Sequence, residues 1–329
     1  MLSIVCPIYN EEKYISQCID SLLQQDYPKE DLEILLVDGM STDNTRTIVK
    51  QYSIKYPYIH LIDNPKKIVP CAMNIGIKNA KGNIIIRLDA HATYEKDYFS
   101  VLSRRLVELE ADNVGVVCKT DVLNKSPKSL AIREVLGNKF GVGNSAFRTG
   151  INKVQEVDTV PFGCWRREVF DKYGMYDERL IRNQDIELSK RIIRGGGKIF
   201  IVPDTYCTYL AREKFSALAK NNYQNGKWNI LTVYYTKQWS SLSIRHFVPM
   251  LFILSIIGPT LLSLIYKPFV LISIISLLSY IITLTLICIP LCIKKKLKFY
   301  YLLASFITLH FSYGWGSIIG IFKLFSIKN

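Results

Sequence analysis

The sequence predicts an α/β domain built on a mainly parallel sheet, followed by helices that cross a membrane. Over the first 205 residues, short unbroken apolar runs alternate with segments of helical spacing, which is typical of parallel strands covered by helices. After residue 246 come three uncharged stretches, each of the roughly 20 residues that a helix needs to cross a bilayer core about 30 Å thick. The predicted divisions are therefore 1–205, 206–246 and 247–329.

The elements of the first division follow in order from their apolar patterns. The expected strands are Leu2–Pro7, Leu32–Val37, Ile59–Ile62 and Asn83–Leu88, and the expected helices are Glu11–Gln25, a segment capped by Ser41–Asn44 that runs through Tyr52, and Pro70–Asn79. In such sheets, ligands bind at the carboxyl ends of the strands. Asn10–Glu12, Asp38 and Asp89 follow or end these strands, so they form the candidate site.

The apolar stretches near the C-terminus are Phe247–Tyr266, Phe269–Ile293 and Phe299–Phe322. The positive-inside rule puts the lysine-rich loop Lys294–Lys298 in the cytoplasm, and the domain two crossings back is then cytoplasmic too. Eight scattered cysteines without a C-x-x-C pair also favour a reducing compartment. Because Pro249, Gly258 and Pro259 interrupt the first stretch, it could instead be re-entrant or interfacial.

The net charge of +14 on a largely apolar chain suggests a negatively charged partner. Part of this charge lies in residues 206–246, where basic side chains alternate with aromatic ones. Nucleic-acid binding could use that mixture, but its place directly before a membrane stretch favours an interfacial segment on anionic lipids. We therefore expect membrane lipids as partners and no nucleic acid.

Acidic residues at three strand ends suit a metal-bound phosphate or the hydroxyl groups of a sugar. Each one also has a structural explanation when it is considered alone. Asp38, directly before Gly39, could shape the turn and cap the next helix. Asp89 could cap a turn through Thr93, and His91 could be a surface histidine.

Taken together, three segments resemble the signatures of family 2 inverting glycosyltransferases. They are Cys6-Pro7-Ile8-Tyr9-Asn10-Glu11-Glu12, Val37-Asp38-Gly39-Met40-Ser41-Thr42-Asp43-Asn44-Thr45 and Arg87-Leu88-Asp89-Ala90-His91-Ala92, and Asn74-Ile75-Gly76 fits between the last two. The Asp-Ala-His-Ala form with a C-terminal membrane segment is most similar to the bacterial succinoglycan type. The resemblance covers about residues 2–205 and implies a GT-A fold with a Rossmann-like nucleotide-binding half and a nucleotide-sugar donor, most often a uridine diphosphate sugar.

The resemblance also implies roles for individual residues at the donor site. Pro7, Tyr9, Glu11, Asp38 and Asp89 take the places that bind the nucleotide sugar. Asp89 and His91 stand where the family has an Asp-x-Asp pair that holds a divalent ion against the diphosphate leaving group. Because a histidine replaces one carboxylate, the expected cofactor is Mn²⁺ in preference to Mg²⁺, which prefers oxygen ligands.

An inverting transfer needs a base to take the proton of the acceptor hydroxyl. Asp185, in Asn183-Gln184-Asp185-Ile186-Glu187 at the start of an expected helix, resembles the family's base motif. The alternative is that Asp185 and Glu187 only complement the helix N-terminus.

On the acceptor side the resemblance is limited to two short segments. Gly163 and Trp165 match an acceptor segment, although Trp165 could equally be a core aromatic. Gln224 and Trp228 faintly resemble a Gln-x-x-Arg-Trp segment of processive synthases, with Lys227 in the place of the arginine. The glycine-rich segment Gly137–Gly150 is predicted to be a loop, either closing over the site or without a role.

The expected function is transfer of one sugar, with inversion, from a nucleotide donor to a lipid-linked or growing polysaccharide acceptor at the cytoplasmic membrane face. One alternative is a processive polysaccharide synthase, for which three membrane helices are few. The other is an inactive membrane export or scaffold protein. The presence of Asp38, Asp89 and Asp185 together argues against inactivity.

Overall fold

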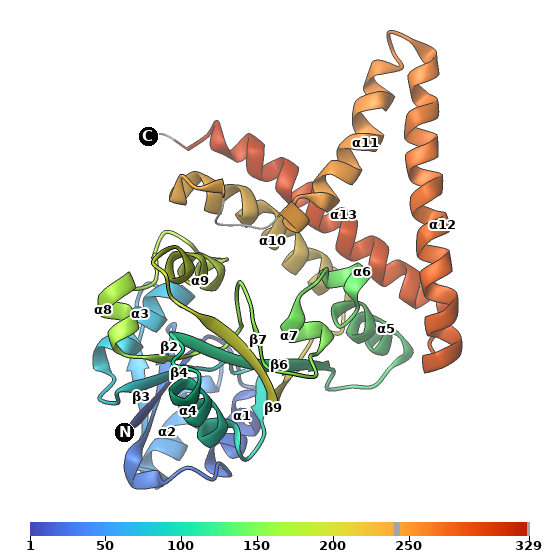
Figure 1. Ribbon diagram of the computed structural model, residues 1–329. Coiled ribbons are helices and arrows are strands. Elements are labelled where there is room, and N and C mark those ends of the chain that lie inside the picture. Colours follow the sequence, from blue (N-terminus) through green and yellow to red (C-terminus); the bar gives the residue numbers. More distant parts are fainter. Residues whose placement is uncertain (240–243, 328–329) are drawn as a thin grey trace. The chain divides into compact units, whose positions relative to one another are not determined.

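The computed structural model describes residues 1–239 and 244–327 and divides the chain into two compact units (Figure 1). The sheet unit contains residues 1–119 and 145–210, and the helical unit contains residues 120–144 and the chain from 211 onward. Each unit is described by itself. Nothing in the sequence pattern predicts that residues 120–144 belong to the helical unit, because they lie within the first predicted division, 1–205.

The sheet unit holds one mixed sheet with the order β3-β2-β1-β4-β8-β6-β9-β5, and β7 pairs with β9. Its strands are β1 (Leu2–Ile8), β2 (Leu32–Asp38), β3 (Ile59–Asp63), β4 (Ile84–Arg87), β5 (Ala92–Tyr94), β6 (Asn113–Asp121), β7 (Gln155–Glu156), β8 (Cys164–Arg166) and β9 (Ile199–Leu210). The pairs β1–β2, β1–β4 and β2–β3 are parallel, as the sequence predicts. Beyond β4 the sheet continues with antiparallel pairs, beginning with β4–β8.

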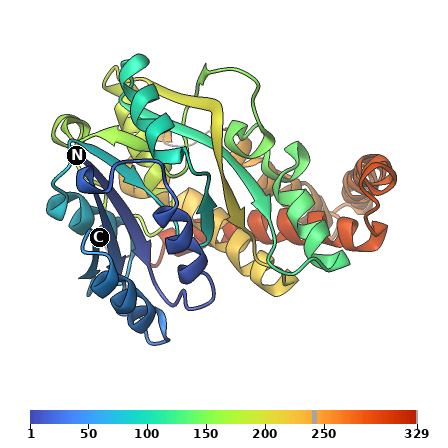
Figure 2. The same cartoon turned by 90° about the horizontal axis from the view of Figure 1, so that it is seen from below.

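Helices cover both faces of this sheet (Figures 1 and 2). They are α1 (Ile15–Leu23), α2 (Thr45–Lys55), α3 (Val69–Asn79), α4 (Tyr98–Glu108), α7 (Ala146–Thr149), α8 (Glu168–Tyr173) and α9 (Gln184–Arg194), with a 3₁₀ turn, η1, at Lys29–Asp31. Alternate residues of β1 enter two separate apolar cores, Ile4 with α1, α2 and α4, and Val5 with α3, α8 and α9. A Cβ at Gly76 of α3 would overlap the Val5 side chain, so this glycine permits the close approach of α3 to β1. The unbroken apolar pattern of the strands follows from burial on both faces.

The helical unit contains α5 (Pro127–Leu136), α6 (Lys139–Val142), α10 (Phe215–Thr236), α11 (Val248–Leu262), α12 (Val270–Lys295) and α13 (Phe299–Leu324), with 3₁₀ turns η3 at Ile244–His246 and η4 at Lys267–Phe269. Among the described residues, two helical segments are long and apolar enough to cross a membrane, Lys267–Lys295 and α13. The first of the three predicted membrane helices is shorter than expected, because α11 ends at Leu262 after 15 residues. At 1.5 Å per residue, that is about 22 Å, less than the core of a bilayer.

Candidate active site

The loops after β1 and β2 are joined by hydrogen bonds at the carboxyl end of the sheet. Asn10 Oδ1 accepts from the backbone N–H of Thr42 at 2.8 Å, and Asn10 N donates to Ser41 Oγ at 2.8 Å. Glu11 N donates to Thr45 Oγ1 at 2.7 Å. The left-handed backbone of Asn10, with φ of 55°, turns the first loop sharply enough to make these contacts. The first two motifs of the sequence therefore build one rigid edge.

Tyr9 lies exposed on this edge, with 47% of its surface accessible. Its ring lies beside Gly39, where an added Cβ would come within 3.2 Å of Tyr9 Cδ2. Pro7, two residues earlier on β1, is half-buried. An exposed aromatic ring supported by a rigid turn offers a face on which a flat ring such as a nucleobase can stack.

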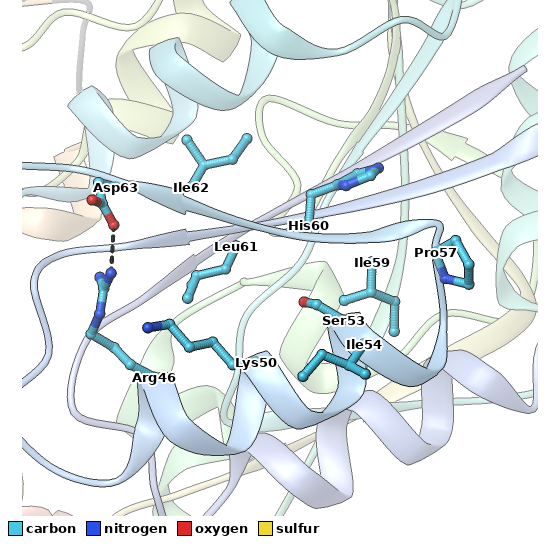
Figure 3. Close-up of a pocket in the computed structure, with 10 residues that line it drawn as sticks. All are labelled: Arg46, Lys50, Ser53, Ile54, Pro57, Ile59, His60, Leu61, Ile62 and Asp63. Atoms are coloured by element: carbon cyan, nitrogen blue, oxygen red, sulfur yellow. Dashed lines mark hydrogen bonds and ion pairs between the residues drawn. The ribbon is translucent and has the colours of Figure 1, made fainter.

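Asp38, at the end of β2, is fully buried and held by contacts within the chain. It accepts hydrogen bonds from Ser41 N at 3.0 Å and from Arg46 Nη1 at 2.5 Å. Arg46 also donates to Asp63 Oδ1 at 2.8 Å, beside a shallow groove along α2 and β3 (Figure 3). The hydrogen bond with Asp38 raises the pKa of Arg46 above its ordinary value. Asp38 thus shapes the turn, as the structural explanation expects, and its contact with a nucleotide stays a prediction.

Two predicted donor-site residues, Glu11 and Asp89, lie beside His91. Its Nδ1 atom lies 3.0 Å from Glu11 Oε2 and 3.6 Å from Asp89 Oδ1. The ring stacks on Tyr14, with centroids 4.5 Å apart. Burial raises the pKa of Asp89, but the hydrogen bond and charge of His91 outweigh burial and bring that pKa below its ordinary value. His91 is therefore packed into the site rather than lying free on the surface.

Asp89 and His91 supply ligand types that suit a divalent cation, a carboxylate and an imidazole. Within residues 1–239 and 244–327, no group of three or more His, Cys, Asp or Glu side chains forms a metal site by itself. Hard divalent cations in phosphate-binding enzymes take one or two protein ligands and complete their shell with substrate phosphates and water. The two side chains therefore fit an ion that is shared with a bound diphosphate.

Asp185 is joined to the strand that leads to this group. It lies in the first turn of α9 and forms an ion pair with Arg87 of β4, two residues before Asp89. The Arg87 side chain is only 8% exposed, and that of Asp185 is 27% exposed. Sequence reasoning included Arg87 in a motif but gave it no role. The available signal was a charged residue directly after the apolar run Ile84-Ile85-Ile86 of the expected strand Asn83–Leu88.

The acceptor-side candidates of the sheet unit lie in its core. Trp165 on β8 is 3% exposed and packs against Phe170, with ring centroids 5.7 Å apart. Gly163 accepts a backbone hydrogen bond from Arg87 N at 3.0 Å, and an added Cβ there would overlap the Asn113 side chain. This packing favours the core alternative for Trp165, and a contact with an acceptor stays a prediction.

The other two acceptor-side candidates lie on α10 of the helical unit. Gln224 is half-buried, and Trp228 is 9% exposed, with its ring centroid 6.4 Å from that of Tyr235. The contacts of Trp228 are those of a residue packed within the unit. A role for Gln224 and Trp228 in acceptor binding stays a prediction.

The sequence profile described as Glycosyl transferase family 2 matches residues 3–174. A transferase of Methanococcus voltae, named dolichyl N-acetyl-α-D-glucosaminyl phosphate 3-β-D-2,3-diacetamido-2,3-dideoxy-β-D-glucuronosyltransferase, is 30% identical over 84% of this chain and 87% of its own length. The succinoglycan biosynthesis protein ExoA of Rhizobium meliloti is 32% identical over 65% of this chain and 64% of its own length.

Two solved structures share the fold. S. aureus TarS residues 1–349 in complex with UDP-GlcNAc aligns over 70% of this chain and 66% of that chain, with a TM-score of 0.50 and 21% identity. GalNAc-T7 with UDP, GalNAc and Mn²⁺ aligns over 64% of this chain and 43% of that chain, with a TM-score of 0.51 and 18% identity. The likeness supports the GT-A architecture that the sequence motifs predict.

Proposed function

The chain belongs to glycosyl transferase family 2 and is a glycosyltransferase that uses nucleotide-sugar donors, and from this premise we propose a specific reaction. It transfers one sugar, with inversion, from a nucleoside diphosphate donor to a lipid-linked saccharide at the cytoplasmic face of a membrane. The observation that carries the proposal is the link between Asp185 and β4 through Arg87, because β4 leads directly to Asp89 and His91.

The loop edge after β1 and β2 supports the assignment of the donor site. Tyr9 presents an exposed ring beside Gly39, where a uracil base can stack. Asp38, Ser41 and Arg46 hold the turn that faces the ribose of such a donor. The basis for a uridine nucleotide is the motif resemblance together with these contacts.

Asp89 and His91 are the proposed ligands of a divalent ion, with Mn²⁺ preferred over Mg²⁺ because one ligand is an imidazole. When bound, this ion neutralises the charge that develops on the diphosphate leaving group. Glu11 supports the arrangement by holding His91 at Nδ1, 3.0 Å away. Contacts of this kind around a metal-binding histidine orient its ring.

Asp185 is the proposed catalytic base. Its carboxylate takes the proton of the acceptor hydroxyl while the hydroxyl oxygen attacks the anomeric carbon from the face opposite the diphosphate, which inverts the configuration. Arg87 holds the carboxylate in place from the neighbouring strand. Because the Arg87 side chain is buried, the Arg87–Asp185 ion pair is favoured in one fixed position. A catalytic base needs such a fixed position to reach the hydroxyl proton.

The apolar helices support a membrane-bound acceptor. Segment Lys267–Lys295 and α13 are long enough to cross a bilayer, and the relative from M. voltae carries a dolichyl-linked acceptor in its name. The lysines of Lys294–Lys298 support a cytoplasmic location for that loop. The basic segment 206–246 is proposed to contact anionic headgroups.

A donor screen tests the proposal. The purified chain is mixed with a lipid extract and a panel of nucleoside diphosphate sugars, and release of nucleotide and labelling of lipid are measured. We expect lipid labelling with one or a few uridine diphosphate sugars, and the Asp185→Asn variant is the matched control. Lipid labelling that is equal in Asp185→Asn and in the unsubstituted chain would contradict the proposed mechanism. So would the absence of lipid labelling with every donor of the panel.

A further inference from the structure

The two helices that are long enough to cross a membrane differ in how much protein covers them. In the most apolar part of the segment Lys267–Lys295, which contains α12, 11% of the residues are buried. In the most apolar part of α13, 44% of the residues are buried. Within residues 302–320, all of which the structure describes, Trp315 is the one exposed residue. α12 therefore has the surface of a lipid-facing helix, whereas α13 is enclosed by other parts of the helical unit.

Much of that enclosure comes from α10, which lies against α13 at backbone distance. A Cβ at Gly226 of α10 would overlap the backbone of Tyr313, and a Cβ at Gly316 of α13 would overlap the backbone of Tyr223. Small residues at such positions allow two helix backbones to touch. The two helices form one close pair.

The two helices run parallel, and α10 covers most of the length of α13. Phe215, at the start of α10, lies 6.4 Å from Tyr301 between ring centroids. Further along both helices, a Cβ added at Gly320 of α13 would lie 3.0 Å from Ile230 Cβ of α10. At 1.5 Å per residue, residues 301–320 extend about 29 Å, nearly the core of a bilayer. If α13 crossed the membrane, α10 would have to cross beside it.

α10 is not a membrane-spanning sequence. The part of it that lies along α13 carries two lysines and five side-chain amides, which are Lys220, Asn221, Asn222, Gln224, Asn225, Lys227 and Asn229. Lysine and amide side chains are strongly disfavoured in hydrocarbon. α10 therefore belongs at a membrane surface, and its partner α13 must lie there with it.

The start of α13 is covered by a second polar helix. Ala131 and Val135 of α5 share an apolar cluster with Leu302 and Phe306 of α13. The same helix carries Lys128, Arg133 and Glu134, and Glu134 pairs with Lys295 at 2.7 Å. Both ends of α13 thus lie beside helices that need water or lipid headgroups.

α11 and α12 form a different kind of surface. They run antiparallel, with Phe252 stacked on Tyr280 at 4.3 Å and Ser255 Oγ 2.6 Å from Ser276 Oγ (Figure 1). Leu264 and Ile265, in the turn between them, are 84% and 87% exposed. The base of the hairpin packs on α13, where Phe252 and Tyr280 contact Phe311. Beyond this contact, the hairpin has apolar side chains on its outer surface and at its tip, which fits the interior of a bilayer.

We propose that α11 and α12 enter the membrane as a hairpin, while α13 stays at the surface with α10 and α5. The chain beyond α13 then lies on the same side as the Lys294–Lys298 loop and the sheet unit. Three crossings would place it on the opposite side. The proposal rests on the proposed membrane association and is independent of sugar transfer.

Thiol labelling in oriented vesicles tests this arrangement. Ser326→Cys places a reporter thiol in an exposed position after α13, and Ile54→Cys places one on the exposed face of α2. A membrane-impermeant maleimide is added to inside-out and to right-side-out vesicles, and the unsubstituted chain gives the labelling of the native cysteines. We expect both variants to be labelled in the same vesicle orientation.

Labelling of Ser326→Cys only in the opposite orientation, or only after detergent, would overturn the proposal. Alkaline carbonate extraction provides the second measurement. The unsubstituted chain should remain in the membrane pellet because of the hairpin, and its complete release would overturn hairpin insertion. Sugar transfer is measured separately on the same vesicles, so a failure of the topology is distinguishable from a failure of the proposed reaction.

Discussion

Arg87 donates a hydrogen bond to Oδ1 of Asp185, which joins β4 to the first turn of α9 across 98 residues of sequence. Arg87 is also anchored through its backbone N–H, which donates to Gly163 O at 3.0 Å. The proposed base is therefore held by a side chain whose own position is fixed by the sheet. This relationship leads to the first two predictions.

Asp185→Asn should abolish most of the activity and leave donor binding nearly unchanged. The amide keeps the shape of the side chain but cannot accept the acceptor's proton, and loss of a positioned base typically costs about 10²- to 10⁴-fold in rate. The measurements are kcat and the donor Kd on a variant whose folding is checked by circular dichroism. Asp177→Asn, in the loop before α9, is the matched control and should retain its activity.

If Asp185 only complements the helix dipole, Asp185→Asn should lose about 0.3–1 kcal/mol of stability and keep most of its turnover. Near-normal kcat in this variant would remove Asp185 from the catalytic role.

Arg87→Lys should lower kcat by about 10²-fold with little change in the KM for the donor. Lysine keeps the charge but lacks the planar, multi-donor guanidinium that fixes a carboxylate, and small displacements of a reacting group cost rates of this order. The double variant Arg87→Lys/Asp185→Asn should be no slower than Asp185→Asn alone, because Arg87 acts through Asp185. Independent, additive losses in kcat would mean that Arg87 has a separate function.

Donor affinity should depend on Asp38. We expect Asp38→Asn to weaken donor binding before it affects the chemical step, because Asp38 holds the turn of Ser41 and the side chain of Arg46. Isothermal titration with the donor found in the screen measures the change. Equal donor affinity with a reduced kcat would contradict this role.

EDTA should stop transfer, and Mn²⁺ should restore it better than Mg²⁺. His91→Asp tests the cause, because it replaces the imidazole with a carboxylate and so provides a second oxygen ligand. The ratio of activity with Mg²⁺ to activity with Mn²⁺ should be higher in His91→Asp than in the unsubstituted chain. Full activity in EDTA, or an unchanged metal preference in His91→Asp, would contradict metal binding by Asp89 and His91.

The parallel half of the sheet was predictable because each strand is buried on both faces and appears as one apolar run, as in Leu32–Val37. In the antiparallel half, β8 and β5 were not predictable, because they have three residues each, too few for a periodic signal. The membrane helices were predicted from length and composition, which do not show that α10 covers α13. Gly226, Gly316 and Gly320 permit the close contact between α10 and α13. Their spacing can be interpreted only once the structure shows that these two helices are paired.

In the site, the motif residues were predictable by type, but their partners were not. Nothing in the sequence joins Arg87 to Asp185 or Glu11 to His91. The first pair depends on the packing of α9 beside β4, and the second on the neighbouring positions of β1 and β4 in the sheet. Trp165 shows the converse limit. A tryptophan in a motif looks the same whether it faces a sugar or, as here, packs against Phe170 in the core.

Acid should destabilise the segment before α9 through Glu178. This carboxylate is held by Lys66 Nζ at 2.6 Å and by Asn74 Nδ2 at 3.1 Å. The hydrogen bond from Lys66, followed by those from Cys71 and Asn74, lowers the pKa of Glu178 to about 2. An unfolded glutamate titrates near pH 4.3. Because the folded pKa is the lower one, the stabilisation is complete above about pH 4.3 and is lost as the pH falls toward 2.

The contribution is expected to be below about 1 kcal/mol, since the Glu178 side chain is 38% exposed and solvent screens the pair. Glu178→Gln removes the titrating group, so unfolding midpoints of both chains in detergent are compared at pH 7, 5 and 3. The unsubstituted chain should lose more Tm between pH 5 and 3 than Glu178→Gln does, by a few degrees. Glu168→Gln, at an exposed glutamate in the first turn of α8, is the matched control and should follow the unsubstituted chain. An equal loss of Tm in Glu178→Gln would show that this carboxylate does not stabilise the segment.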